Sequence, residues 1–455
     1  MPSTARRVDQ TPSLVRITSD VADARVALTR RRGFEETKLS PRMREGVRRV
    51  FGGELSPEAV VDRVLNDVRI EGDAAVRRYT AAFDGTSLEE IEVPREQWTT
   101  ALAMLSLDLR DALRLAAEQI AVFHRKQVRT SWLDYTEEGA LGQIVRPLER
   151  VGIYTPGGTA IYPSSLLMTA VPARVAGVSE IIVCSPPGPD GDVSPLILAA
   201  AEVAGVDRVF GIGGAQAVAA MAYGTETVPH VDKIYGPGNI FVVLAKQRVY
   251  GVVAIDQLPG PTETLLVADE SADAVLVAAD LLAQAEHDPM ASAILLTTSE
   301  ALADAVDREL VTQLEGLERR EIAAQSLRAN GLIVVVPTVE TAMELANAYA
   351  PEHLCLLLRD PWQVIPLVRH AGGVFVGEDS PEALGDYTAG PSHVMPTGGT
   401  ARFSSPIHVG EFTKVISLAA ANRRALERLG PATATLARAE GLTAHARAIE
   451  RRLEE

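Results

Sequence analysis

The most constraining feature of the sequence is a series of short apolar runs, each ending in a glycine-rich turn and followed by a helix-like segment. Four such units follow one another at intervals of roughly thirty residues, the length of a strand–helix–strand unit. They begin with VGIYTPGG at Val151, IIVCSPPG at Ile181, RVFGIGG at Arg208 and KIYGPGN at Lys233. This alternation is typical of a parallel sheet of nucleotide-binding type, with ligands at the carboxyl ends of its strands.

A second series of apolar runs follows and also alternates with helical stretches. Its members are TLLVAD at Thr264, AILLTT at Ala293, LIVVVP at Leu332, HLCLLL at His353 and GVFVG at Gly373. Before the first series, residues 56–127 carry apolar side chains at helical spacing and predict a helical scaffold. The sequence therefore predicts an α/β fold with two Rossmann-like parallel-sheet domains.

Changes of pattern along the chain divide it into four ranges. Residues 1–140 are predicted to form the N-terminal helical part of the first α/β domain, and residues 141–249 a dinucleotide-binding α/β domain. Residues 250–397 are predicted to complete the first α/β domain and to carry the metal site described below. Residues 398–455 combine a loop rich in Gly, Thr, Ser and Pro with terminal helices, and this segment is too small to fold alone.

Composition and charge narrow the range of partners. The 455 residues include 44 Lys and Arg against 60 Asp and Glu, and the net charge of -16 disfavours nucleic acid and anionic membranes. The sequence contains no run of about 18 apolar residues that would span a membrane and no secretory signal, so we expect a cytoplasmic protein. Cys184 and Cys355 lie in apolar runs and are expected to be buried, reduced thiols.

The glycine-rich turns raise the question of a dinucleotide. The turn GIGGAQ places Gln216 where a GxGxxG motif needs its third glycine, so the standard motif is absent. Bare backbone N–H groups in these turns could still bind a phosphate, although glycine also serves turns that bind nothing. Tyr154, Gln216 and Asn239 lie in or beside these turns, where each could hydrogen-bond a ribose or an amide or support its own loop.

Two polar side chains in the stretch LLAQAEHD form a candidate metal site. Gln284 and His287 stand three residues apart, so on a helix both would project from one face, with Glu286 turned aside. Imidazole suits zinc, and an amide oxygen is a weak, exchangeable ligand. Alone, the same pair is also typical of an ordinary polar helix face.

Further acid and imidazole groups follow this stretch. Glu352 and His353 stand directly before the apolar strand LCLLL, where they could activate water and transfer a proton, or merely open the strand. Asp386 and His393 lie in a glycine-bracketed loop of the kind that often carries function. His445 follows Glu440 in a terminal segment that could equally be a solvated helix.

Several of these strings together resemble the histidinol dehydrogenase family. They are QAEHD, YAPEHL, GDYTAGPSHVMPTGG and AEGLTAH, with VGIYTPGG, GGAQAVAA, IYGPGN and AIDQLPGPTE before them in the same order as in that family. The resemblance extends over most of the chain. It implies oxidation of L-histidinol through L-histidinal to L-histidine, with two NAD molecules reduced and one Zn²⁺ per subunit, in histidine biosynthesis.

The resemblance also implies roles for individual residues. Glu352 matches the water-activating base and His353 the proton-transferring histidine, and the family is a homodimer in which the partner subunit supplies one zinc ligand. The zinc ligands implied are Gln284, His287, Asp386 and, from the partner, His445. The substrate contacts implied are Thr262, Gln284, His287, His353, Asp386, His393, Glu440 and His445, and the NAD contacts are Tyr154, Gln216 and Asn239.

The sequence departs from the family pattern at a few positions. Thr262 stands where many members have serine, Ser392 stands where many have asparagine, and SSPIHVGEF differs from the commoner version of that segment. Related proteins oxidise other small polar alcohols such as sulfopropanediol, so a same-family dehydrogenase of another alcohol is the alternative. A nucleotide-binding regulatory protein with structural histidines is a further hypothesis, from a different functional class.

Overall fold

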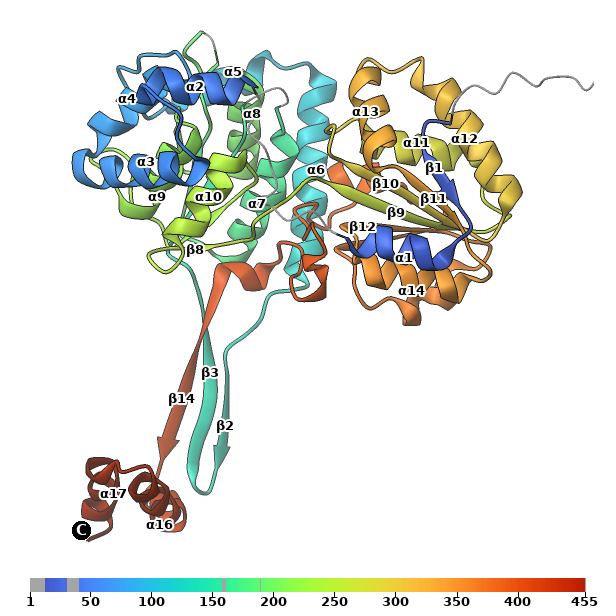
Figure 1. Cartoon of the computed structure of the whole chain (residues 1–455). Coiled ribbons are helices and arrows are strands. Elements are labelled where there is room, and N and C mark those ends of the chain that lie inside the picture. The colour runs from blue at the N-terminus through green and yellow to red at the C-terminus, as the bar shows by residue number, and fades with distance from the viewer. Residues whose placement is uncertain (1–12, 31–40, 158–160, 189, 455) are drawn as a thin grey trace, which may run out of the picture.

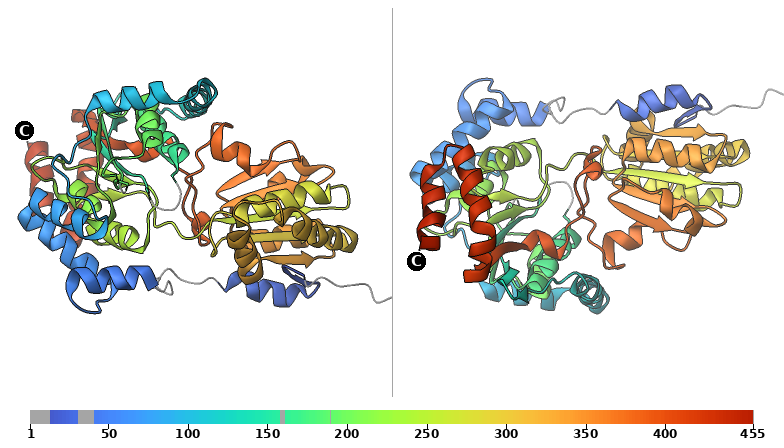
Figure 2. Two further views of the ribbon diagram at one scale, coloured as in Figure 1. Left: turned by 90° about the horizontal axis from the view of Figure 1, so that it is seen from above. Right: turned by 90° about the horizontal axis from the view of Figure 1, so that it is seen from below.

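The computed structural model describes residues 13–30, 41–157, 161–188 and 190–454. It consists of two lobes that lie side by side and a long arm that projects from one of them (Figures 1 and 2). The first lobe is built on a five-stranded sheet, and the second lobe on a six-stranded sheet. A three-stranded sheet forms the arm.

The first lobe contains a parallel sheet with the strand order β6-β5-β4-β7-β8. The strands are β4 (Arg150–Tyr154), β5 (Glu180–Cys184), β6 (Arg208–Phe210), β7 (Lys233–Tyr235) and β8 (Ala254–Ile255). One face packs against α2 (Pro41–Phe51), α3 (Pro57–Glu71), α4 (Asp73–Phe83), α9 (Gly214–Tyr223) and α10 (Ile240–Val249). The other packs against α5 (Arg95–Met104), α6 (Leu107–Arg125), α7 (Pro163–Ala176) and α8 (Pro195–Ala204).

The second lobe contains a parallel sheet with the strand order β1-β11-β10-β9-β12-β13. The strands are β1 (Arg16–Thr18), β9 (Glu263–Ala268), β10 (Ser292–Thr297), β11 (Leu332–Val335), β12 (His353–Leu357) and β13 (Gly373–Val376). One face packs against α11 (Ala274–Ala285), α12 (Glu300–Leu314) and α13 (Arg320–Asn330). The other packs against α1 (Val21–Thr29) and α14 (Val339–Tyr349), and a short α15 (Glu382–Tyr387) follows β13.

Local sequence signals set the ends of many of these helices. Ser56 and Ser194 accept hydrogen bonds from backbone N–H groups at the starts of α3 and α8, and each is followed by a proline suited to the first helical position. Gly177 and Gly205 end α7 and α8 in the left-handed conformation that glycine adopts without steric cost. Apolar runs between these signals therefore fold as separate strands and helices.

The strand order of each sheet reverses direction once. In the first lobe the chain moves from β4 to β5 and β6 and then returns to β7 on the other side of β4. In the second lobe it moves from β9 to β10 and β11 and then returns to β12 on the other side of β9. Ligands of open α/β sheets usually bind at such a reversal, outside the carboxyl ends of the strands.

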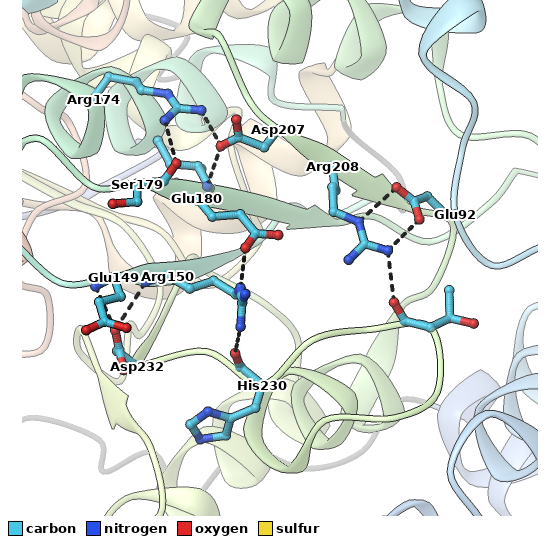
Figure 3. Close-up of polar contacts among 12 residues, drawn as sticks. Glu92, Glu149, Arg150, Arg174, Ser179, Glu180, Asp207, Arg208, His230 and Asp232 are labelled. Carbon is cyan, nitrogen blue, oxygen red and sulfur yellow. Dashed lines mark hydrogen bonds and ion pairs between the residues drawn. The ribbon is translucent and has the colours of Figure 1, made fainter.

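The amino edge of the first sheet is tied together by ion pairs and backbone contacts (Figure 3). Arg150 bonds Glu180 on the neighbouring strand at 2.6 Å, and Arg208 bonds Glu92 at 2.9 Å. Asp232 accepts the backbone N–H of Arg150 at 3.1 Å. These groups satisfy one another, so this edge is structural, and the glycine turns lie at the opposite edge.

The arm is an antiparallel sheet that carries the C-terminal helices away from both lobes (Figure 1). It consists of β2 (Trp132–Thr136), β3 (Gly139–Pro147) and β14 (Thr413–Ala421), in the order β14-β3-β2. Beyond it lie α16 (Arg423–Ala439) and α17 (Thr443–Glu454), which pack on each other through small buried side chains. At the tip of the arm, α16 and α17 thus pack mainly against each other.

The fold confirms the prediction of two parallel sheets with a helical C-terminal segment. Both cysteines are buried and free, as expected. The sequence analysis did not predict the arm, nor that β1 near the N-terminus joins the sheet of the second lobe. The domain ranges and the dimerisation role of the C-terminal segment stay predictions.

A buried ion pair fixes the turn after β7. Lys246 on α10 is fully buried, and it pairs with Asp256, whose side chain is 3% exposed. Lys246 Nζ donates to the carbonyl of Gly236 at 2.9 Å, and Asp256 accepts the N–H of Gly236 at 2.8 Å. Gly236 has φ +109°, and a Cβ at this position would collide with the carbonyl oxygen of Tyr154, so only glycine fits. The pair therefore holds the turn from both sides.

We predict that Lys246→Met lowers the free energy of unfolding by about 3–5 kcal/mol, because Asp256 would remain buried without its cation. The double variant Lys246→Met/Asp256→Leu should recover about half of that loss, since Gly236 still lacks its partners. Urea unfolding measures both. Arg248→Met, on the same helix, is the control: its pair with Asp62 is exposed and should be worth less than about 1 kcal/mol. A double variant no more stable than Lys246→Met would contradict the prediction.

Candidate active site

The candidate catalytic groups gather at the amino edge of the six-stranded sheet, where its strand order reverses. Thr262 is the residue before β9, and His353 is the first residue of the neighbouring β12. The expectation from general rules was a site at carboxyl ends. Here that expectation fits only the first lobe, because in the second lobe Thr262, Glu352 and His353 stand where the strands begin.

A hydroxyl links the amide of α11 to the buried acid. Thr262 Oγ1 donates to Glu352 Oε2 at 2.6 Å, so its oxygen accepts from Gln284 Nε2 at 2.8 Å. The backbone N–H of Glu263 also donates to Glu352 Oε2, at 3.0 Å. Burial raises the pKa of Glu352, against the opposing effects of His353 and these hydrogen bonds. Glu352 is therefore a carboxylate whose affinity for a proton is greater than usual.

Acceptor groups lie near both ring nitrogens of His353, but only Nδ1 has one within hydrogen-bond distance. Its Nδ1 lies 3.2 Å from the carbonyl oxygen of Glu263 and 3.7 Å from Glu352 Oε2, and its Nε2 lies 3.6 Å from Asp386 Oδ1. Burial lowers the pKa of His353, but the surrounding carboxylates outweigh it and raise the pKa to about 10. Both nitrogens therefore favour the protonated form, in which His353 is a proton donor.

Gln284 and His287 come together, but not by the predicted helix geometry. The helix α11 ends at Ala285, so His287 lies beyond it and the prediction of one helical face was wrong. A turn through Glu286, closed by the N–H of His287 on the carbonyl of Gln284 at 3.3 Å, keeps the two residues adjacent. Burial lowers the pKa of His287, which leaves its imidazole neutral and able to bind a metal.

Asp386 and His393 complete the cluster from α15 and the loop after it. Burial acts to raise the pKa of Asp386, but His353 and the other nearby imidazoles outweigh it and leave the pKa below its usual value. His393 Nδ1 lies 2.7 Å from the backbone carbonyl of Asp386 and 3.9 Å from its Oδ1. The structure therefore brings a carboxylate and a second imidazole to the groups on β9, α11 and β12.

The donor set fits a divalent cation that is incompletely enclosed by one chain. Because Gln284 uses its Nε2 on Thr262, its amide oxygen is left as a possible ligand beside neutral His287 and ionised Asp386. Among the described residues, no group of three or more His, Cys, Asp or Glu side chains is arranged to hold a metal.

The predicted cofactor contacts lie around the carboxyl edge of the first sheet. Tyr154 ends β4 and its hydroxyl accepts the N–H of Gly214 at 3.2 Å. Gln216, in the first turn of α9, is 1% exposed and its Nε2 has no hydrogen-bond partner. Asn239 caps α10 through Oδ1, which leaves its NH₂ group for a ligand. A buried unpaired amide beside close-packed glycine turns fits a nucleotide site.

Two predicted residues lie apart from this cluster. Glu440 follows α16 and His445 lies in α17, and both are exposed. Figure 1 places these helices at the tip of the arm, away from both lobes. Within one chain, therefore, the structure unites Thr262, Gln284, His287, Glu352, His353, Asp386 and His393, and it leaves Glu440 and His445 outside.

Comparisons with known proteins identify the family. A family model described as histidinol dehydrogenase matches residues 53–453. The histidinol dehydrogenase of Deinococcus radiodurans is 55% identical over 434 residues, covering 95% of this chain and 98% of that protein. A crystal structure of histidinol dehydrogenase from Elizabethkingia anophelis has a TM-score of 0.90 and 35% identity, and the match covers 98% of this chain and 99% of that chain.

The chain belongs to the histidinol dehydrogenase family. The family member from Moorella thermoacetica is 54% identical over 417 residues, with 90% of this chain and 98% of that protein covered. No helix in the described part of this chain has the length and apolar character needed to cross a membrane. The roles of the individual site residues stay predictions in this family member.

The departures from the family pattern are accommodated locally. Thr262 keeps the hydroxyl that bridges Gln284 and Glu352. Ser392 donates to the carbonyl of Met168 on α7 at 3.1 Å, so it ties the His393 loop to the first lobe. Both residues thus make a polar contact in this chain.

Sequence reasoning missed a buried acid beneath the cluster. Glu382, the first residue of α15, is 2% exposed, and its Oε2 has no hydrogen-bond partner. Burial raises its pKa to about 7. A helical spacing of four from Asp386 was the available signal, but an acid in a helix's first turn is ordinarily a solvated residue.

We predict that Glu382→Gln stabilises the metal-free protein at pH 8 by about 2 kcal/mol and leaves it unchanged near pH 5. The pKa of Glu382 is raised above its unfolded value, so its neutral form stabilises the fold at low pH and this contribution is lost as the pH rises through 7. Urea unfolding of chelator-treated protein at both pH values measures the effect. Glu300→Gln, at the exposed first position of α12, is the control. Equal stabilisation at both pH values would sink the prediction.

Proposed function

We propose that this chain oxidises L-histidinol through L-histidinal to L-histidine in histidine biosynthesis, with two NAD molecules reduced and one zinc ion per subunit. The observation that supports this most directly is the hydrogen bond from half-buried Thr262 to buried Glu352 beside Gln284, in a chain of the histidinol dehydrogenase family. It places Glu352, whose pKa is raised, close to Gln284, a candidate ligand of the zinc ion. A cytoplasmic location is part of the proposal, since the reaction needs a supply of soluble NAD.

The overall reaction removes two hydrides and adds one water. The alcohol loses a hydride and a proton to give the aldehyde, water adds to the aldehyde, and the hydrate loses a second hydride and proton to give the acid. NAD would accept the hydrides, and zinc would supply Lewis-acid polarisation of the substrate oxygen. Gln284, His287 and Asp386 would hold the metal together with His445 of the partner subunit.

Side chains of the protein would transfer the protons of the alcohol and of the attacking water. His353 lies between Glu352 and Asp386, so its neutral ring would receive the proton that the alcohol releases, and the carboxylates that raise its pKa would stabilise the imidazolium formed. Glu352, with its raised pKa, is suited to take a proton from water as that water attacks the aldehyde. The hydrogen bonds from Thr262 and Glu263 hold this carboxylate in one orientation. No cysteine nucleophile is needed, and both cysteines are buried.

The cofactor would lie across the carboxyl edge of the first sheet. Tyr154 and Asn239 flank the point where the strand order reverses, and Gln216 follows β6. The nicotinamide end would then face the gap toward the second lobe, where the substrate groups stand. This arrangement uses opposite edges of the two sheets for the two reactants.

The proposed function predicts two NADH formed per L-histidinol consumed by zinc-loaded enzyme. Absorbance of NADH and quantification of L-histidine in the same sample measure the ratio. Sulfopropanediol is the comparison substrate for the alternative within the family. A single NADH per alcohol, or turnover of sulfopropanediol with none of L-histidinol, would overturn the substrate assignment.

A hybrid dimer tests whether the proposed zinc site is shared. We predict that His445→Ala and His287→Ala chains, each inactive alone, regain about half of the wild-type activity when combined, because one of the two sites then receives both histidines. Differently tagged chains purified as the hybrid allow the measurement. If both histidines served the same chain, each site would lack one ligand and the hybrid would stay inactive.

A further inference from the structure

A helix of the first lobe makes a direct contact with a candidate substrate residue of the site. Ser165 lies in the first turn of α7, at the carboxyl edge of the five-stranded sheet. Its hydroxyl oxygen lies 2.9 Å from His393 Nε2. The next contact along the same helix is the bond from Ser392 to the carbonyl of Met168. Residues 392 and 393 are therefore attached to α7 at two successive turns.

The partners of His393 determine which atom carries the proton. Its Nδ1 lies 2.7 Å from the carbonyl oxygen of Asp386, which only accepts, so Nδ1 carries a hydrogen. In the neutral ring Nε2 then presents a lone pair, to which the Ser165 hydroxyl donates. The contacts at both nitrogens thus select one tautomer and one ring orientation.

The hydrogen bond between Ser165 and His393 joins the two lobes. Thr262, Glu352 and Asp386 belong to the second lobe, whereas Ser165 belongs to the lobe that carries the candidate cofactor residues. A ring that was fixed only from the second lobe would keep the Nδ1 bond and could still turn about it. The Ser165 bond removes that freedom from the side on which the cofactor would lie.

We propose that Ser165 is a positioning residue for substrate binding that acts through His393. Its bond to Nε2 holds the imidazole in one orientation beside Asp386, so the ring loses less freedom when it contacts the substrate. The inference rests on the proposed function, in which His393 contacts substrate.

The first test asks whether loss of the Ser165 hydroxyl changes KM for the substrate more than it changes kcat. Ser165→Ala should raise KM for L-histidinol about tenfold, the loss expected for one hydrogen bond, while kcat changes less than about threefold. KM for NAD should stay within about twofold of wild type. Ser165→Thr keeps the hydroxyl and should restore KM for L-histidinol.

A double-mutant cycle tests whether Ser165 acts through His393. In a His393→Ala background, Ser165→Ala should change KM for L-histidinol by less than about twofold, since the group it positions is gone. Thr169→Val is the control on the same helix: its hydroxyl donates only to the Ser165 carbonyl, one turn back, and its loss should leave KM unchanged. Thermal unfolding of every variant shows whether the fold is intact.

Three results would overturn the inference: an unchanged KM in Ser165→Ala, failure of Ser165→Thr to restore it, or an equal effect of Ser165→Ala with and without His393. The proposed function is judged separately, on the NADH yield of the wild-type enzyme from L-histidinol. If the wild type gives two NADH and the cycle is additive, the function stands and the role of Ser165 does not.

Discussion

Both sheets of the lobes are parallel and covered on both faces, and this constraint decides where chemistry can occur. Strands such as β9 are buried along their whole length, so a charged side chain within them would lack partners. Polar groups are tolerated where strands begin or end, beside free backbone N–H and C=O groups. Glu352 and His353 meet this condition, because the N–H and C=O of Glu263 satisfy one group each at the start of the neighbouring strand.

The two lobes place their candidate site residues at opposite edges of their sheets. The first lobe offers the carboxyl edge of its sheet, where glycine turns and the N-termini of helices favour a phosphate-bearing ligand. The second lobe offers its amino edge, where the end of α11 brings Gln284 and His287 to the starts of β9 and β12. The loop that contains His393 bridges the edges through Ser165. In the proposed function, hydride transfer would need the two reactants in contact, and each of these edges would hold one of them.

The sequence predicted what is local and missed what depends on distant pairing. The two series of apolar runs identified nearly every strand of the lobes, because most of these strands are buried and alternate with helices. The strand β14 pairs with β3 across a long separation and is mostly exposed, so neither periodicity nor burial marked it. His287 was placed on a helix that stops two residues earlier. Ser165 and Glu382 were missed because their importance comes from partners far along the chain, which spacing alone does not reveal.

The arm offers a reason why one chain would not supply every ligand of the proposed metal site. It places α16 and α17 beyond the reach of their own lobes, yet exposes apolar side chains such as Leu141 and Ile416 along its length. In the proposed dimer these surfaces would be covered. His445 would enter the partner's cluster and would bind the metal there together with Gln284, His287 and Asp386. A metal bound in this way joins two chains, so its binding free energy also stabilises the assembly. Catalysis and dimer formation would then depend on the same few bonds.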